Sequence, residues 1–144
     1  MEKDREIQEI MLGMVYDKAR EFYGESIVEY GTNPSNSGVI DDPDGYAKIT
    51  GICGDTVEMF LEMEGDKIRD AKFLTDGCML SIAACSVATE MAQGKSVRDC
   101  IGITQSAILK RLEKMPADHE HCALLASMVL QSALRQCRQN RESD

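Results

Sequence analysis

The feature that most constrains the fold is a pair of strand-like segments joined by a tight turn. Residues 56–64 alternate apolar and polar side chains as a half-buried strand does, the apolar set being Val57, Met59, Leu61 and Met63. Glu64-Gly65-Asp66 predicts a turn, residues 67–75 predict a further strand, and residues 46–52 predict one before them. Because such short connections join antiparallel neighbours, the three segments predict an antiparallel meander.

Helical patterns flank this meander. Residues 4–22 place apolar side chains three and four positions apart, which predicts an amphipathic helix that ends near Gly24. Residues 31–45 are rich in Gly, Pro, Asn and Asp, which predicts a loop. Four further helices are predicted over residues 79–93, after Ser96, over residues 104–114 and over residues 118–138, the last with Leu125, Met128, Val129 and Ser132 facing inward. Strands followed by helices indicate an α+β fold with the helices packed on one face of a small sheet.

Length and charge limit the possible functions. The 144 residues are expected to form one domain, with residues 1–25 as an N-terminal helix and residues 135–144 as a frayed tail. The net charge is −9, and residues 1–70 carry 17 acidic and 7 basic side chains. An acidic chain without a basic stripe argues against nucleic-acid binding. A membrane span is not expected either, because the chain lacks an apolar run of about 18 residues.

The cysteine content points to chemistry that uses free thiols. The start, MEKDREIQEI, resembles neither a signal peptide nor a transit peptide, so we expect the protein to stay in the cytosol. Thiols are kept reduced in that compartment. The six cysteines are therefore expected to bind metal, react or be buried rather than form disulfides; they are Cys53, Cys78, Cys85, Cys100, Cys122 and Cys137.

Five residues form a candidate site: Cys53, Asp55, Cys78, His121 and Cys122. All of them fall at predicted element ends, where side chains from distant segments can meet at one edge of a domain. Thiolates and imidazole are the ligands of zinc and iron–sulfur centres. Cys78 and Cys122 also lie at predicted helix starts, where the helix dipole favours a thiolate.

Each of these residues also has a structural interpretation. A lone cysteine is most often a small buried hydrophobic side chain, His121 could cap a helix or lie at the surface, and Asp55 could serve its turn. The chain has no CxxC pair, so spacing alone leaves metal binding and separate structural roles equally open.

The remaining cysteines and histidine are expected to lie outside the site. Cys85 follows Cys78 by seven residues, about 10.5 Å along a helix, which is too far to share a metal. Cys100 is predicted to be a core residue, Cys137 an incidental thiol near a frayed end, and His119 a solvent-facing side chain.

The sequence resembles a known family, the U-type iron–sulfur cluster assembly scaffolds, which comprise IscU and the N-terminal domain of NifU. The resemblance covers roughly residues 30–134. The matching stretches are NPSNSG at 33–38, GICGDTVEMFLEMEGDKIRDAKFLTDGC at 51–78, the ATEM and GKS run at 88–96, and HCALLA at 121–126.

The resemblance implies a scaffold rather than an enzyme with turnover of its own. Its metal ligands carry over to Cys53, Asp55, Cys78, His121 and Cys122, with Cys122 as the acceptor of persulfide sulfur from a cysteine desulfurase. Three thiolates plus His121 or Asp55 would hold a [2Fe-2S] cluster, and the same pocket would take Zn²⁺. The implied partners are the desulfurase, an electron donor such as a ferredoxin, and recipient apo-proteins. Three thiolates and one harder ligand bind a cluster less securely than four thiolates, which suits a protein that must release it.

The chain departs from the family in one segment, and two alternative functions remain open. Residues 115–119 replace the segment that a dedicated Hsp70-type chaperone reads, which argues against chaperone-assisted release. A zinc-bound sulfur acceptor of the SufU type would use the same ligands, but no long insertion separates Cys78 from Cys122 as in that branch. A Cys–His hydrolase or transferase would use Cys122 as nucleophile. The adjacency of His121 argues against it, because neighbouring helical side chains do not face each other.

Overall fold

Three strands form the predicted antiparallel meander. The computed structural model describes residues 2–143, and the side chains of residues 5–15 and 17–138. The sheet has the order β1 (Gly45–Thr50), β2 (Thr56–Glu64) and β3 (Lys67–Thr75), with Gly65 at a φ of 65° in the β2–β3 turn. The bounds of β2 and β3 are those predicted from the alternation of side chains.

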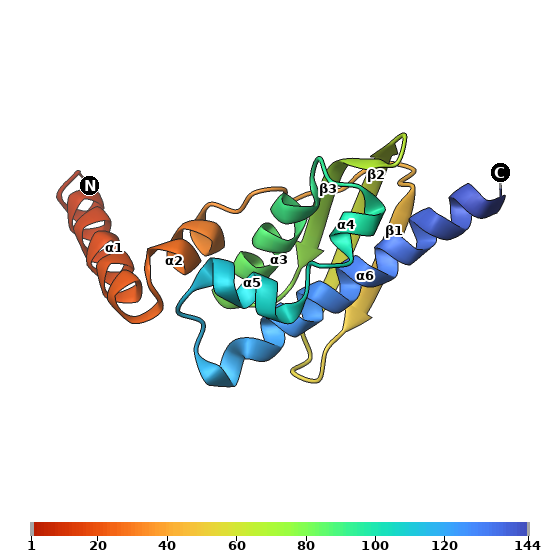
Figure 1. Ribbon diagram of the computed structural model, residues 1–144. Coiled ribbons are helices and arrows are strands. Elements are labelled where there is room, and N and C mark those ends of the chain that lie inside the picture. Colours follow the sequence, from red (N-terminus) through yellow and green to blue (C-terminus); the bar gives the residue numbers. More distant parts are fainter. Residues whose placement is uncertain (1, 144) are drawn as a thin grey trace.

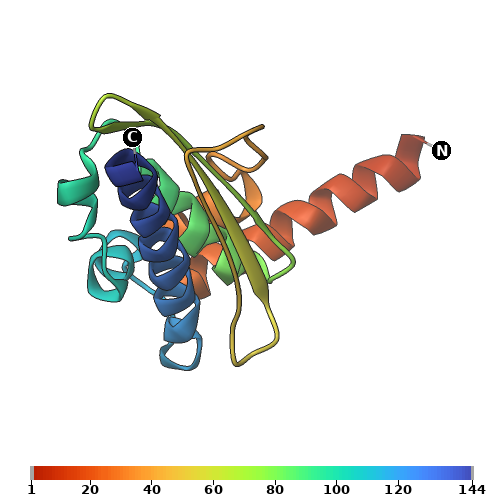
Figure 2. The ribbon, with the colours of Figure 1, turned by 90° about the vertical axis from the view of Figure 1, so that its right-hand side faces the viewer.

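Helices pack on one face of this sheet, as the α+β prediction requires. The C-terminal part contains α3 (Met79–Ala92), α4 (Val97–Cys100), α5 (Gln105–Leu112), a 3₁₀ turn (Ala117–His119) and α6 (Glu120–Ser143) (Figure 1). Figure 2 shows α3 and α6 side by side against the same face of the sheet. The buried side chains between these layers include Met59, Leu61, Phe73, Val87 and Leu130.

The N-terminal region differs from the sequence prediction in one element. Helix α1 (Glu2–Tyr23) ends before Gly24 as predicted, and it projects from the body of the protein (Figures 1 and 2). Helix α2 (Glu25–Thr32) was not predicted. Its formation depends on tertiary burial, because Ile27 and Val28 are fully buried and α2 packs against α3.

Two expectations about α6 were wrong. Met128, predicted to face inward, is 47% exposed, whereas Leu125 and Val129 are buried. Cys137, predicted to be an incidental thiol near a frayed end, is 1% exposed. Its sulfur packs so closely against Gly45 of β1 that a side chain at position 45 would clash with it. The helix itself continues to Ser143, five residues beyond the predicted end.

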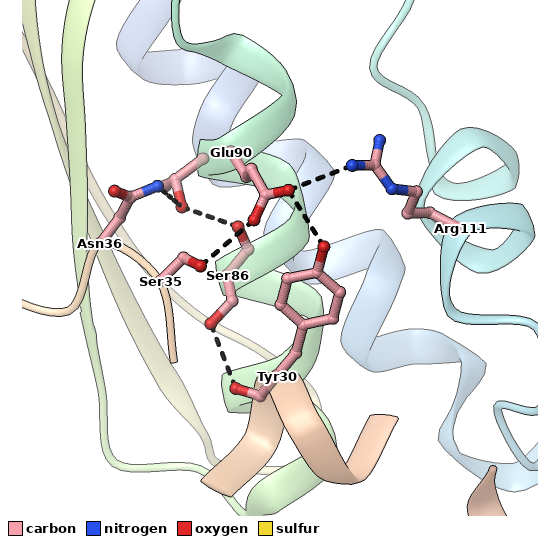
Figure 3. A network of polar contacts seen from close by, with 7 residues as sticks. Tyr30, Ser35, Asn36, Ser86, Glu90 and Arg111 are labelled. Carbon is pink, nitrogen blue, oxygen red and sulfur yellow. Dashed lines mark hydrogen bonds and ion pairs between the residues drawn. The ribbon is translucent and has the colours of Figure 1, made fainter. Parts of the chain in front are cut away.

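A polar network fixes α2 and the NPSNSG loop to α3 (Figure 3). The Glu90 carboxylate accepts hydrogen bonds from the Tyr30 hydroxyl at 3.0 Å and the Ser35 hydroxyl at 3.2 Å. It also pairs with the Arg111 guanidinium of α5 at 3.1 Å. One carboxylate thus joins three separate segments, which gives the 33–38 motif a structural role.

Asn36 is the centre of that motif. Its φ of 68° lies in the left-handed region, which Asn tolerates better than most residues. The side-chain amide donates to Thr89 Oγ1 at 3.2 Å, and the backbone carbonyl accepts from the Phe73 amide at 2.9 Å. The loop therefore bridges α3 and the outer edge of β3.

No helix in the described part of the chain has the length and apolar character needed to cross a bilayer.

Candidate functional site

The first segment of the site is the loop between β1 and β2. The Gly51 amide donates to the Asp55 carbonyl at 2.8 Å and the Gly54 amide donates to the Gly51 carbonyl at 3.0 Å. Gly54 has a φ of 89°, a conformation that favours glycine. This tight loop leaves Cys53 exposed and Asp55 half-buried, so the CGD motif presents a thiol and a carboxylate from one turn.

The second segment is the turn from β3 into α3. Cys78 is the N-cap residue of α3, and its carbonyl accepts the first helical hydrogen bond, from Ile82, at 3.0 Å. The Cys78 side chain is exposed. The preceding Gly77 amide donates to Thr75 Oγ1 at 3.1 Å, which closes the turn.

The third segment is the first turn of α6. His121 is exposed and its ring lies 6.0 Å from that of His119, centroid to centroid. Cys122 is 4% exposed and faces the interior. His119 is half-exposed and its Nδ1 lies 3.0 Å from Asp118 Oδ1. The adjacent His121 and Cys122 side chains therefore point in different directions, which argues against a Cys–His nucleophile pair.

The three segments meet at one end of the molecule (Figures 1 and 2). Asp55 and Cys122 are brought together through Ser81 of α3, whose Oγ lies 3.1 Å from Asp55 Oδ2 and 3.4 Å from Cys122 Sγ. Among the described side chains, however, no three His, Cys, Asp or Glu residues form a group that could hold a metal ion. Convergence of Cys53, Cys78 and Cys122, together with His121 or Asp55, on one metal centre thus stays a prediction.

The electrostatic surroundings of Cys122 differ from the expectation for a helix start. Burial raises the pKa of the Cys122 thiol, and the neighbouring Cys78, Cys53 and Asp55 raise it further. The hydrogen bond from Ser81 acts in the opposite direction and lowers this pKa. The net effect disfavours the thiolate, and burial is its largest cause.

An apolar pocket adjoins the exposed side of the site. Its volume is about 190 Å³, and Cys53 and His121 form part of its wall. The rest of the lining is mostly aliphatic and consists of Ile49, Thr50, Gly51, Ile52, Leu124, Leu125 and Met128. The exposure of Met128 is explained by this pocket, which no other element of the described chain fills.

The remaining cysteines lie away from the site or in the core. Cys85 and Cys100 are fully buried, which confirms the core position predicted for Cys100, and Cys137 is buried contrary to prediction. The sequence interpretation missed Ser81. A signal was present, because Ser81 lies three residues after Cys78 and is a polar side chain in an otherwise apolar helical run.

The sequence matches the family described as the NifU-like N terminal domain over residues 22–144. The iron-sulfur cluster assembly scaffold protein IscU 1 of Archaeoglobus fulgidus is 35% identical over 113 residues, which are 78% of this chain and 74% of that protein. The iron-sulfur cluster assembly scaffold protein IscU of Rickettsia prowazekii is 35% identical over 127 residues, covering 84% of this chain and 95% of that protein.

Solved structures support the same fold. The N-terminal NifU-like protein of Brucella abortus aligns with a TM-score of 0.70 at 20% identity, over 84% of this chain and 97% of that one. A SufU protein of Fervidobacterium islandicum aligns with a TM-score of 0.68 at 24% identity, over 80% and 98%. With the meander, the CGD loop, the capping Cys78 and the His-Cys helix start all in place, the chain belongs to the IscU/NifU N-terminal domain family.

Proposed function

We propose that this protein is a scaffold on which a [2Fe-2S] cluster is assembled and from which it passes to apo-proteins. The observation that carries the proposal is the meeting of three ligand-bearing segments at one end of the molecule, with Asp55 and Cys122 joined through Ser81. Iron and sulfur are the cargo of such a site. Three thiols, an imidazole and a carboxylate supply the soft and hard ligands that iron accepts.

Cys122 is the proposed acceptor of sulfur. After it loses its proton, the Cys122 thiolate attacks the outer sulfur of a persulfide on a cysteine desulfurase, the S–S bond of that persulfide breaks, and the desulfurase cysteine leaves as a thiolate that can take up a proton in turn. The product is a persulfide on Cys122. Its reduction to sulfide takes two electrons, which an electron donor such as a ferredoxin supplies.

The mixed ligand set suits temporary storage. Cys53, Cys78 and Cys122 supply three thiolates, and the fourth ligand is His121 or Asp55. A hard carboxylate oxygen bonds less firmly than a thiolate in a sulfur-rich shell, so Asp55 favours release of the cluster. The SufU-type alternative, a zinc-bound sulfur acceptor, would use the same side chains and differs in what they finally hold.

Anaerobic reconstitution tests the proposal. The full chain is incubated with Fe(II), cysteine, a catalytic amount of cysteine desulfurase and a reductant, then desalted and assayed for iron, acid-labile sulfide and visible absorbance. We expect the assays to find iron and acid-labile sulfide in equal amounts, as a [2Fe-2S] cluster requires. The cluster should be lost in Cys53→Ser, Cys78→Ser and Cys122→Ser. Cys85→Ser is the matched control, because it removes a buried thiol of α3 outside the ligand set.

Two results would contradict the scaffold proposal. Persulfide on Cys122 with bound zinc and no iron would favour the zinc-dependent sulfur acceptor. Equal cluster yield in Cys122→Ser and Cys85→Ser would show that the predicted ligands are not the ones used.

A further inference from the structure

Ser81 occupies the centre of the site without being one of the predicted ligands. Its side chain is 2% exposed, and its hydroxyl contacts both Asp55 Oδ2 and Cys122 Sγ. A hydroxyl carries one hydrogen, so Ser81 donates to the Asp55 carboxylate or to the Cys122 sulfur, one at a time, and both acceptors lie within hydrogen-bond distance of it. The carboxylate is the stronger acceptor, and a hydrogen bond to a charged group is the shorter and stronger kind.

The same serine also supports the turn that carries Cys78. A Cβ atom added to Gly77 would lie 2.6 Å from Ser81 Cβ, 2.7 Å from Ser81 Oγ and 3.0 Å from Asp55 Oδ2. The backbone of the turn therefore packs directly on the Ser81–Asp55 pair, and glycine is needed for this close approach. Ser81 thus lies beside all three segments that carry the candidate ligands.

We propose that Ser81 is a positioning residue that holds the Asp55 carboxylate and the Cys122 sulfur toward a single bound cation. The inference rests on the proposed scaffold function and deepens it, because it names the side chain that pre-arranges the site. One carboxylate oxygen accepts the hydrogen bond of Ser81, which leaves the other for a cation. Hydrogen bonds to ligands fix their orientation before the metal arrives, and loss of such a partner costs about 10- to 100-fold in metal affinity.

Cobalt binding tests this role without requiring a cluster. Co(II) is added anaerobically to the full chain, and thiolate-to-cobalt charge-transfer and visible d–d bands report affinity and ligand set. We expect Ser81→Ala to weaken Co(II) binding by about 10- to 100-fold. Its d–d spectrum should resemble that of Asp55→Ala, since both variants lose the positioned oxygen ligand.

Ser86→Ala is the matched control for Ser81→Ala. Ser86 lies on the same helix, is fully buried and donates to the Tyr30 carbonyl at 3.4 Å, away from the site. Alanine is a better helix former than serine, so both variants should fold, and circular dichroism checks this. Ser86→Ala should leave cobalt affinity within about twofold of the parent protein, because distant sites with no shared partners act independently.

A double-mutant cycle separates positioning from general support. In an Asp55→Ala background, the additional effect of Ser81→Ala should shrink to a few-fold, because its main partner is gone. Equal cobalt affinity of Ser81→Ala and Ser86→Ala would overturn the role of Ser81, and so would an effect that is the same with or without Asp55. Failure of the unmutated protein to bind Co(II) with thiolate bands would instead overturn the proposed function together with this inference.

Discussion

The six cysteines divide into two sets of three, one of candidate ligands and one of buried thiols. Cys53, Cys78 and Cys122 lie at a loop, a helix cap and a first helical turn. Cys85 and Cys137 lie farther along α3 and α6, Cys100 is the last residue of α4, and all three are at most 1% exposed. Burial raises the pKa of Cys100 and of Cys137 to about 11, and raises that of Cys85 still more.

The comparison shows that the packing around a thiol decides what it can do, since Cys100 is fully buried although it ends α4. A cysteine inside a packed helix is a small apolar side chain whose thiolate is strongly disfavoured by desolvation. At an element end, the side chain can reach solvent or a neighbouring segment. Cys122 belongs to both groups, because it is buried yet contacts the hydroxyl of Ser81, which lowers its pKa against the effect of burial.

The largest expected difference between the two sets concerns sulfur transfer. Cys122→Ser should abolish persulfide acceptance from a cysteine desulfurase, because the attacking sulfur is removed. Cys85→Ser should accept sulfur like the parent protein. Sulfane sulfur is trapped with an alkylating probe and mapped by mass spectrometry, and undiminished label on another cysteine of Cys122→Ser would contradict the assignment.

Alkylation rates should separate the two sets next. Iodoacetamide at neutral pH should modify the exposed Cys53 and Cys78 at least tenfold faster than Cys85, Cys100 and Cys137, because the reagent reaches only the exposed thiols. Cys122 should react slowly at pH 7 and faster as the pH rises, because its raised pKa keeps it protonated at neutral pH. Peptide mapping over a pH series measures this, and rapid labelling of Cys122 at pH 7 would count against the burial effect.

The buried set should make the fold sensitive to alkali. Between the ordinary thiol pKa of 9.0 and about 11, Cys100 and Cys137 lose their protons in the unfolded chain but keep them in the folded one. Stability is therefore fully present below pH 9 and falls as pH rises through this window, by at most about tenfold in the unfolding constant per pH unit for each thiol. Urea unfolding at pH 8, 9 and 10 measures the fall.

Cys100→Ala is the informative variant for that measurement. It should show a smaller loss of stability between pH 8 and 10 than the parent protein, since one of the titrating thiols is gone. The exposed Cys53→Ala serves as control and should keep the parent's pH dependence. Identical slopes for all three proteins would exclude a contribution from Cys100.

The smallest expected effect concerns release of the finished cluster. Asp55→Ala should lose its cluster to a chelator a few-fold more slowly than the parent protein, with His121 as the fourth ligand, because a hard oxygen is the weaker ligand in a sulfur-rich shell. The same variant is expected to bind a single Co(II) ion more weakly. The two expectations agree, because binding of one ion and loss of a cluster use different ligand sets. Equal or faster loss of visible absorbance would favour a purely structural role for Asp55 in its turn.

Local sequence patterns determined the meander and the placement of the candidate ligands. The bounds of β2 and β3, the stop at Gly24 and the cap at Ser96 all follow from side-chain alternation and from residues with strong turn or capping preferences. Because these signals act within a few residues, they can be read without knowing what packs against them. The same reasoning placed Cys53, Cys78 and Cys122 at element ends.

Tertiary structure alone decided which faces are covered and which side chains meet. Helix α2 is stabilised by burial of Ile27 and Val28, and Met128 is exposed because it borders an open pocket. The sequence could not show that Ser81 joins Asp55 to Cys122, because these residues lie 26 and 41 positions away along the chain. Desolvation likewise depends on the complete packing around an atom, which is why the helix-start argument misjudged the pKa of Cys122.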